Sequence, residues 1–143
     1  EAELMDSKTY VFPSNTHGII QKDSPYHHMR VRITVDLELQ VIDAAAITLV
    51  GPYQICPQGA QNIKNLIGLK IGAGWKRRVQ TAIGGPSGCT HITELTGPIA
   101  TTAYQTIGGE ISRRRRADME NGDSRARNED SSLKNSCIAF SQS

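Results

Sequence analysis

The sequence predicts an α+β protein, in which a three-stranded antiparallel meander is followed by about three helices packed on one of its faces. Apolar residues alternate with period two before residue 50, which is typical of half-buried strands. After Pro57 their spacing becomes helical. The chain of 143 residues has the length of one two-layer domain, which we place at residues 1–109.

Three segments read as strands. The first covers residues 4–12 and ends at Pro13, before a polar turn. The second begins near Met29, and its alternation predicts a polar and an apolar face. The apolar face comprises Met29, Val31, Ile33 and Val35, and the polar face comprises Arg30, Arg32 and Thr34. The third strand covers residues 39–50, after a short turn.

Three helices follow, separated by glycines. Pro57 suits the first position of a helix because its missing N–H is not needed there. The buried positions expected in the first helix are Ala60, Ile63, Leu66 and Ile67, and those of the second are Trp75, Val79, Ala82 and Ile83. The third begins near Ser87 or Thr90 and buries Ile92, Leu95, Ile99, Ala103 and Ile107. Pro98 predicts a kink or a break in it.

The remainder of the chain is expected to be a tail. Gly108 and Gly109 are predicted to close the third helix. Residues 110–132 contain four consecutive arginines, mixed charges and few apolar residues, which predicts a disordered charged linker. Residues 133–143 regain some hydrophobicity around Cys137 and are interpreted as a partial C-terminal element.

Composition narrows the classes of function. The net charge is only +2, and one Trp and two Phe supply few rings for stacking on bases, which argues against nucleic-acid binding. No apolar run approaches membrane-spanning length, so we expect no membrane association. Three cysteines that lie far apart do not form a disulfide framework, and they indicate reduced thiols in a bacterial-type cytoplasm. A protein partner or a homodimer remains open.

The strongest candidate site is the segment Gly88-Cys89-Thr90-His91-Ile92-Thr93-Glu94, where a glycine-rich loop opens a helix. Unpaired backbone N–H groups at a helix start favour a thiolate, so Cys89 is the first candidate. His91 can meet Cys89 only if Cys89 belongs to the preceding loop, since residues two apart diverge on a helix. Glu94 shares a helix face with His91 and could orient it, although an exposed polar pair is the plainer interpretation.

Cys56 lies in a similar setting, immediately before Pro57. If the two helix starts meet, Cys56, Cys89 and His91 would offer two thiolates and an imidazole, which suit zinc or an iron–sulfur cluster. The alternative is that each cysteine is a small buried apolar residue. Of the other histidines, His27 should share the inward side with Met29 and have a structural role, and His28 should face outward. His17 lies in a polar turn and is expected to be inert.

Five segments resemble a bacterial family without an assigned activity, domain of unknown function 2889. They are residues 29–36 (MRVRITVD), 55–57 (ICP), 68–75 (GLKIGAGW), 88–95 (GCTHITEL) and 97–107 (GPIATTAYQTI). The resemblance covers the chain from Glu1 to about Ile107. It implies a further segment before Glu1 and a continuation after the last residue. His28 and Ile138 replace an aspartate and a histidine of the family pattern, and the second replacement weakens any role for Cys137.

A more distant resemblance concerns the order of elements. The order of elements resembles that of NifU-type iron–sulfur scaffolds, in a NifU/SufE-like two-layer arrangement. It consists of strands, a cysteine at a helix start, a glycine-rich loop and a cysteine that opens a last helix. This resemblance implies Cys56, Cys89 and His91 as ligands of a cluster or zinc. Fold alone does not determine function, however.

Three interpretations of the function therefore stay open. In the first, the chain is a small thiol-based binding or carrier module that holds metal, an iron–sulfur cluster or sulfur at Cys56, Cys89 and His91. In the second, it is an enzyme acting on a small molecule, with Cys89 as the reactive thiol and His91 or His27 as its partner. In the third, it is an interaction domain with structural cysteines.

Overall fold

A computed structural model describes residues 1–120 and 138–141 of the chain. The chain divides into two compact units, Glu1–Ile107 and Gly108–Ser143, and each is considered by itself. The first unit contains the sheet, the apolar core and the predicted site residues Cys56, Cys89 and His91. In the second unit, the described residues form the last part of a long helix and the short 3₁₀ turn η5 (Ile138–Phe140).

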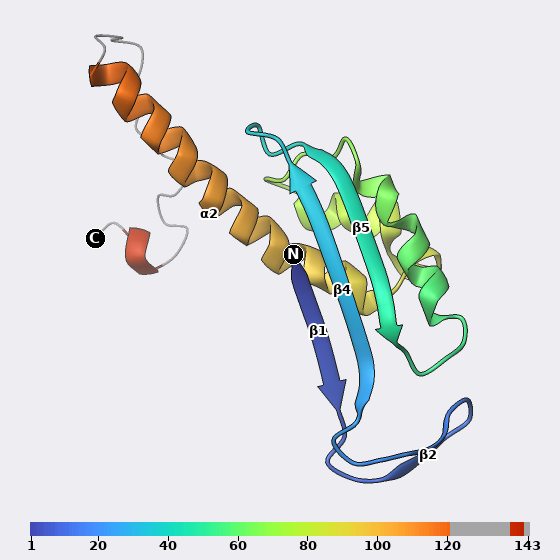
Figure 1. The fold of residues 1–143 in the computed structure, drawn as a ribbon. Helices are drawn as coiled ribbons and strands as arrows, with labels where there is room; N and C mark the ends of the chain where they lie inside the picture. Colours follow the sequence, from blue (N-terminus) through green and yellow to red (C-terminus); the bar gives the residue numbers. More distant parts are fainter. Residues whose placement is uncertain (121–137, 142–143) are drawn as a thin grey trace. The chain divides into compact units, whose positions relative to one another are not determined.

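The first unit is built on an antiparallel sheet with the strand order β1-β4-β5 (Figure 1). Its strands are β1 (Ala2–Ser7), β4 (Pro25–Val35) and β5 (Val41–Val50). The predicted α+β class is confirmed. The alternation of β4 is also confirmed, because Met29 and Val31 are fully buried whereas Arg30 and Arg32 are exposed. On β5 the pairing with β4 shifts next to Ile42, which leaves Val41 and Ala44 both facing the core.

The end predicted for the first strand, residue 12, is wrong for β1. It ends at Ser7, and residues 12–20 instead form a separate hairpin of β2 (Phe12–Ser14) and β3 (Gly18–Ile20). Contacts distant in sequence hold this hairpin: Thr16 Oγ1 donates to the carbonyl of Pro52, and His17 Nε2 donates to the carbonyl of Gly51 over 2.9 Å. His17 is therefore a cross-link between the hairpin and the end of β5.

The element after Pro57 is a 3₁₀ helix, η1 (Cys56–Leu66). Its buried residues Ala60, Ile63 and Leu66 are spaced by three, which is the number of residues in one 3₁₀ turn. Ile67 was expected to be buried by α-helical spacing, but it is 43% exposed because the three-residue turn places it outside the stripe.

The second and third predicted helices are present. They are α1 (Trp75–Ile83) and α2 (Thr90–Glu120), with the short turn η2 (Gly85–Ser87) between them. The indole N–H of Trp75 donates to the carbonyl of Thr96 over 3.1 Å and so ties α1 to α2. Both residues are buried, and Thr96 is the polar member of the core that the sequence pattern missed.

The expected end of the third helix is wrong. The helix α2 continues through Pro98 without a break and passes Gly108 and Gly109 to reach Glu120. Beyond the glycines, Glu110 pairs with Arg113 and Arg114, three and four residues later, at 2.8 and 2.6 Å. These hydrogen bonds lower the pKa of Glu110 to about 2. Part of the predicted linker over residues 110–132 is thus helical, and its remainder lies outside the described residues.

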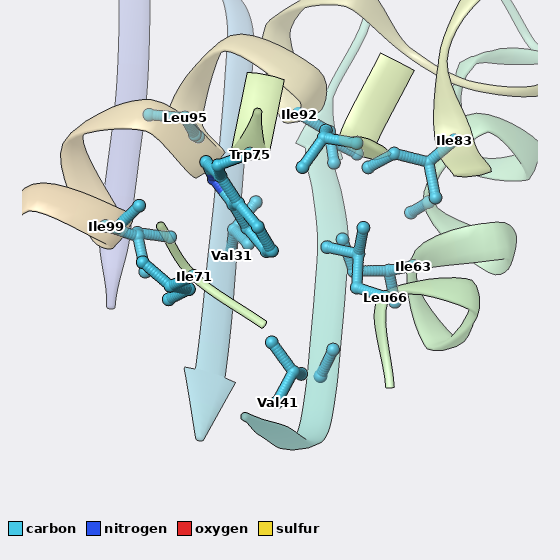
Figure 2. Packing of buried hydrophobic residues seen from close by; sticks show 14 of the residues in the cluster. Val31, Val41, Ile63, Leu66, Ile71, Trp75, Ile83, Ile92, Leu95 and Ile99 are labelled. Atoms are coloured by element: carbon cyan, nitrogen blue, oxygen red, sulfur yellow. The ribbon is translucent and has the colours of Figure 1, made fainter. Parts of the chain in front are cut away.

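The apolar core lies between one face of the sheet and the helices (Figure 2). From the sheet it takes Met29, Val31, Val41 and Ala44. From the helical layer it takes Ala60, Ile63, Leu66, Ile71, Trp75, Val79, Ile83, Ile92, Leu95, Ile99 and Ala100. The helices therefore cover one face of the sheet, as the sequence predicted. Among the described residues, we find no helix with the length and apolar character needed to cross a membrane.

Candidate functional site

Cys89 occupies the last position before α2. Its carbonyl accepts the first backbone hydrogen bond of the helix, from Thr93 N–H at 2.9 Å, and also a bond from Thr93 Oγ1 at 2.9 Å. This is the position of an N-cap residue, next to the unpaired N–H groups that carry the positive end of the helix dipole. Cys89 thus belongs to the loop, which is the condition under which the sequence allowed it to meet His91.

Two glycines make room for this loop. A Cβ atom on Gly88 would lie 1.8 Å from the carbonyl oxygen of Ile83, so only glycine fits at this position. A Cβ atom on Gly59 of η1 would lie 2.9 Å from the Cβ of Cys89. The glycines therefore allow the loop to approach both the end of α1 and the side of η1, which determines where the thiol lies.

His91 lies beside the thiol. Its Nδ1 lies 3.8 Å from Cys89 Sγ, within the range of a sulfur hydrogen bond. Partial burial lowers the pKa of His91 below its usual value, and the positive charge of His27 lowers it further, against a smaller opposing effect of Asp6. The imidazole is therefore neutral at neutral pH, with a nitrogen free to accept the thiol proton.

His27 lies against the other side of His91, which the sequence alone did not show. The two imidazole rings are 4.1 Å apart between centroids and inclined by 36°. Asp6 lies directly opposite His27 in the β1–β4 pairing. Its carboxylate accepts hydrogen bonds from the backbone N–H of His27 at 2.7 Å and from Nδ1 at 3.0 Å. A continuous line of contacts thus runs Asp6–His27–His91–Cys89.

The charge of Asp6 is maintained within this line. Its partial burial would raise the pKa of the carboxyl, but the side-chain and backbone hydrogen bonds from His27 outweigh that effect. The net result is a pKa below the usual value, so Asp6 is a carboxylate at neutral pH. Because a carboxylate can only accept, Nδ1 of His27 carries a proton, and the ring is held in one orientation.

Aromatic residues cover His27. Tyr26 packs edge-on against the His27 ring at 4.8 Å, and Phe12 of the β2–β3 hairpin packs edge-on against Tyr26 at 5.0 Å. The side chain of His27 is only 15% exposed. Tyr26, backed by Phe12 of the hairpin, therefore covers part of the His27 ring.

Cys89 also lines a hollow of about 390 Å³ between η1 and the loop before α2. It is lined by Ile55, Cys56, Gln58, Gly59, Gln61, Asn62, Pro86, Ser87, Gly88 and Cys89. All of these side chains are uncharged, and several can form hydrogen bonds. The hollow, which we call the thiol hollow, gives a small neutral molecule access to Cys89.

Cys56 also lines the thiol hollow, but it does not complete a metal site. It is the first residue of η1, and its sulfur packs near Gly51, where an added Cβ would lie 3.1 Å away. Cys56 and Cys89 are both free thiols. Within the part of the chain that the structure describes, no group of three or more His, Cys, Asp and Glu residues is arranged to hold a metal ion. The expected set of Cys56, Cys89 and His91 thus gains no support as a zinc or cluster site.

The remaining candidates lie elsewhere. Glu94 is exposed and lines a small hollow beside Trp75 and Lys76 on α1, whereas the contacts of His91 come from Cys89 and His27. His28 faces away from His27, as alternation predicts, and pairs with Glu3. Cys137 lies outside the described residues.

Sequence reasoning did not single out Asp6, and it gave His27 a structural role or, in the enzyme interpretation, that of a partner to Cys89. The sequence carries only a weak signal for the contacts of Asp6 and His27. Asp6 begins a polar run after Leu4 and Met5, and only the strand register places it opposite His27. The contact between His27 and His91 joins the start of β4 to the start of α2, and no spacing in the sequence encodes it.

Comparison with known proteins agrees with the similarity seen in the sequence motifs. No curated protein and no solved structure matches the chain, so the NifU-like arrangement remains a resemblance in element order. The model of one family, described as a protein of unknown function (DUF2889), matches residues 1–105. That match covers nearly the whole first unit, including the line from Asp6 to Cys89. The chain therefore belongs to the DUF2889 family.

Proposed function

We propose that Cys89 is a nucleophilic thiol that forms a transient covalent bond with a small, uncharged, electrophilic molecule, with His91 as its base. The observation that carries this proposal is the 3.8 Å contact between Cys89 Sγ and Nδ1 of a neutral His91 at the start of α2. A thiol is weakly reactive until it loses its proton, and an adjacent imidazole is a common means of removing it.

Each part of the site has a role in this chemistry. His91 accepts the thiol proton on Nδ1, and the N-terminal N–H groups of α2 stabilise the resulting thiolate. The Asp6–His27 pair holds His91 from the opposite side. The uncharged lining of the thiol hollow favours a neutral substrate over an ion, because a charged group would lose its hydration without gaining a partner.

A carrier of metal or sulfur is the other interpretation that the sequence left open. A sulfur carrier would use the same thiol, but it has less need of a base positioned on it. The hydrogen-bonded pair of Cys89 and His91 therefore favours the enzyme, and the described residues offer no third ligand that would favour metal.

The test is the rate at which Cys89 is alkylated by iodoacetamide. In the reduced protein, we expect Cys89 to react faster than Cys56 and faster than free glutathione at neutral pH. His91→Asn keeps a polar atom near the Nδ1 position but cannot take up a proton. It should slow alkylation of Cys89 by about tenfold, because the thiol then lacks a base for its proton.

Glu94→Gln is the matched control, since Glu94 lies one helical turn from His91 and is exposed. It should leave the alkylation rate unchanged. Peptide mapping by mass spectrometry assigns the label to each cysteine. A Cys89 that reacts no faster than glutathione in the folded protein would refute the proposal.

A further inference from the structure

The thiol hollow holds a second thiol, which the proposed chemistry does not use. Cys56 and Cys89 both line it, from η1 and from the loop before α2. We infer that the two form a reversible disulfide when the protein meets a hydroperoxide, with Cys89 oxidised first and Cys56 as the resolving thiol. This inference rests on the proposed function, because it requires Cys89 to be the reactive thiolate.

The placement of the two cysteines follows from η1. Gly59 lies against Cys89, since a Cβ on Gly59 would be 2.9 Å from that of Cys89. Cys56 precedes Gly59 by three residues, and residues three apart on a 3₁₀ helix project from the same side. Cys56 is therefore one turn, about 6 Å along the helix axis, from the residue that touches Cys89.

Disulfide formation requires the first turn of η1 to move. The Cα atoms of a disulfide are about 4.4–6.8 Å apart, and the sulfur of Cys56 now packs toward Gly51. The first turn is held by backbone hydrogen bonds from Cys56 N–H to Tyr53 at 3.0 Å and from Gln58 N–H to Ile55 at 2.9 Å, and by a 3.5 Å bond from Thr48 Oγ1 to the carbonyl of Cys56. A 3₁₀ helix as long as η1 is uncommon because its hydrogen bonds are poorly aligned, and the inference requires its first turn to bend toward Cys89.

The chemistry balances with a hydroperoxide as the oxidant. The Cys89 thiolate attacks one peroxide oxygen, the O–O bond breaks, and Cys89 becomes a sulfenic acid while hydroxide (or an alkoxide) leaves. The sulfur of Cys56, as its thiolate, then attacks the sulfur of Cys89. The S–S bond forms, the S–O bond breaks, and the departing oxygen leaves as water with the proton of Cys56. Overall, two thiols lose two electrons to the peroxide, which is reduced to water and an alcohol or a second water.

His91 determines which cysteine reacts first. It contacts Cys89 and not Cys56, so only Cys89 has a base for its proton. A thiolate attacks peroxide and a thiol does not. The resolving step protects Cys89, because a disulfide is reduced by a thiol whereas a sulfinic acid is not.

The experiment treats the full chain with hydrogen peroxide in slight excess and then blocks the remaining thiols. The variant Cys137→Ser leaves only Cys56 and Cys89 to react. We expect the intact protein to lose two hydrogens without gaining oxygen, and peptide mapping to show Cys56 joined to Cys89 within one chain. Treatment with dithiothreitol should restore both thiols. Hydrogen exchange should report a changed first turn of η1 in the oxidised form.

The variant Cys56→Ser separates this inference from the proposed function. In it, Cys89 should progress to the sulfinic acid, because no resolving thiol remains to form a disulfide. If Cys89 is alkylated rapidly but the parent also accumulates sulfinic acid with Cys56 free, the disulfide inference is wrong and the reactive thiol stands. If Cys89 is slow toward both reagents, both proposals fail.

Discussion

At the scale of single residues, the candidate site is a line of four side chains, each in contact with the next. Asp6 orients the ring of His27, His27 lies on the ring of His91, and His91 contacts Cys89. Positive charge on His27 acts against protonation of His91, whereas the negative charge of Asp6 favours it. The pKa of His91 therefore depends on its burial and on both His27 and Asp6.

Removing the charge of Asp6 should lower the pKa of His91 further. In Asp6→Asn the carboxylate that favours protonation of His91 is lost, so burial and His27 act with less opposition. The measurement is an NMR titration of the histidine ring protons. Asp43→Asn is the control, because Asp43 pairs with Lys64 and Arg32 and does not act on His91. A rise in the pKa of His91 in Asp6→Asn would contradict this assignment.

At the scale of elements, the period of η1 decides which residues are buried. An α-helical reading placed both Leu66 and Ile67 in the core, but the three-residue turn buries only the first of them. Sequence spacing could not separate the two periods, because Ala60, Ile63 and Leu66 also fit one stripe of an α-helix. The tight turn also keeps Cys56 and Gly59 on one side, which is what brings η1 to the thiol hollow.

Substitutions at the neighbouring residues Leu66 and Ile67 test the three-residue period of η1. Leu66→Ala removes a side chain with no exposure and should lower the free energy of unfolding by about 2–5 kcal/mol. Ile67→Ala removes a side chain that is 43% exposed, and its effect should be about 0.5 kcal/mol or less. Urea unfolding followed by the fluorescence of Trp75, the one tryptophan, measures both. Equal losses in the two variants would show that the turn is α-helical.

The end of α2 illustrates a different limit of sequence reasoning. Two glycines followed by a run of arginines indicated the end of the helix, since glycine is unfavourable in a helix interior and like charges repel. The helix instead continues, and Glu110 pairs with Arg113 and Arg114 on the same face. The prediction gave more weight to the glycines and the arginine run than to these ion pairs. The spacing of three and four residues that allows the pairs is nevertheless visible in the sequence.

At the scale of the whole molecule, the shifted pKa values of the described carboxyl groups and of His91 are all lowered. The pKa of His91 is lowered by burial first, and those of Glu3 and Asp43 are lowered by hydrogen bonds to their partners. Each of these groups binds its proton less readily in the folded chain than in the unfolded one. These groups therefore make their full contribution to the free energy of unfolding above the pKa values that they have in the unfolded chain. That contribution is lost as pH falls through the pKa values that they have in the folded chain.

The protein should lose stability in two stages on acidification. The first begins as pH falls below the usual histidine pKa, about 6.5, because the unfolded chain then takes up a proton that folded His91 resists. The second begins near the usual carboxyl pKa, about 4. Urea unfolding at a series of pH values measures both stages. In His91→Asn the first stage should be smaller, and an unchanged first stage would show that His91 does not contribute.

The sequence by itself determined the layers and much of the site. Alternation around Met29 and helical spacing around Trp75 predicted the sheet, the helices and the face that each buries, because burial selects apolar residues at the period of the element. The segment from Gly88 to His91 predicted a thiol at a helix start, since glycine, capping and charge at a helix end are local in the chain.

Tertiary structure alone decided which distant residues meet. The pairing of β1 with β4 placed Asp6 on His27, and the packing of α2 beside the start of β4 placed His27 on His91. Packing of η1 against the loop before α2 likewise brought Cys56 and Cys89 to one hollow, without a third metal ligand among the described residues. These contacts depend on strand register and on the fit of the layers. Both are properties of the packed core, and short-range sequence patterns do not specify them.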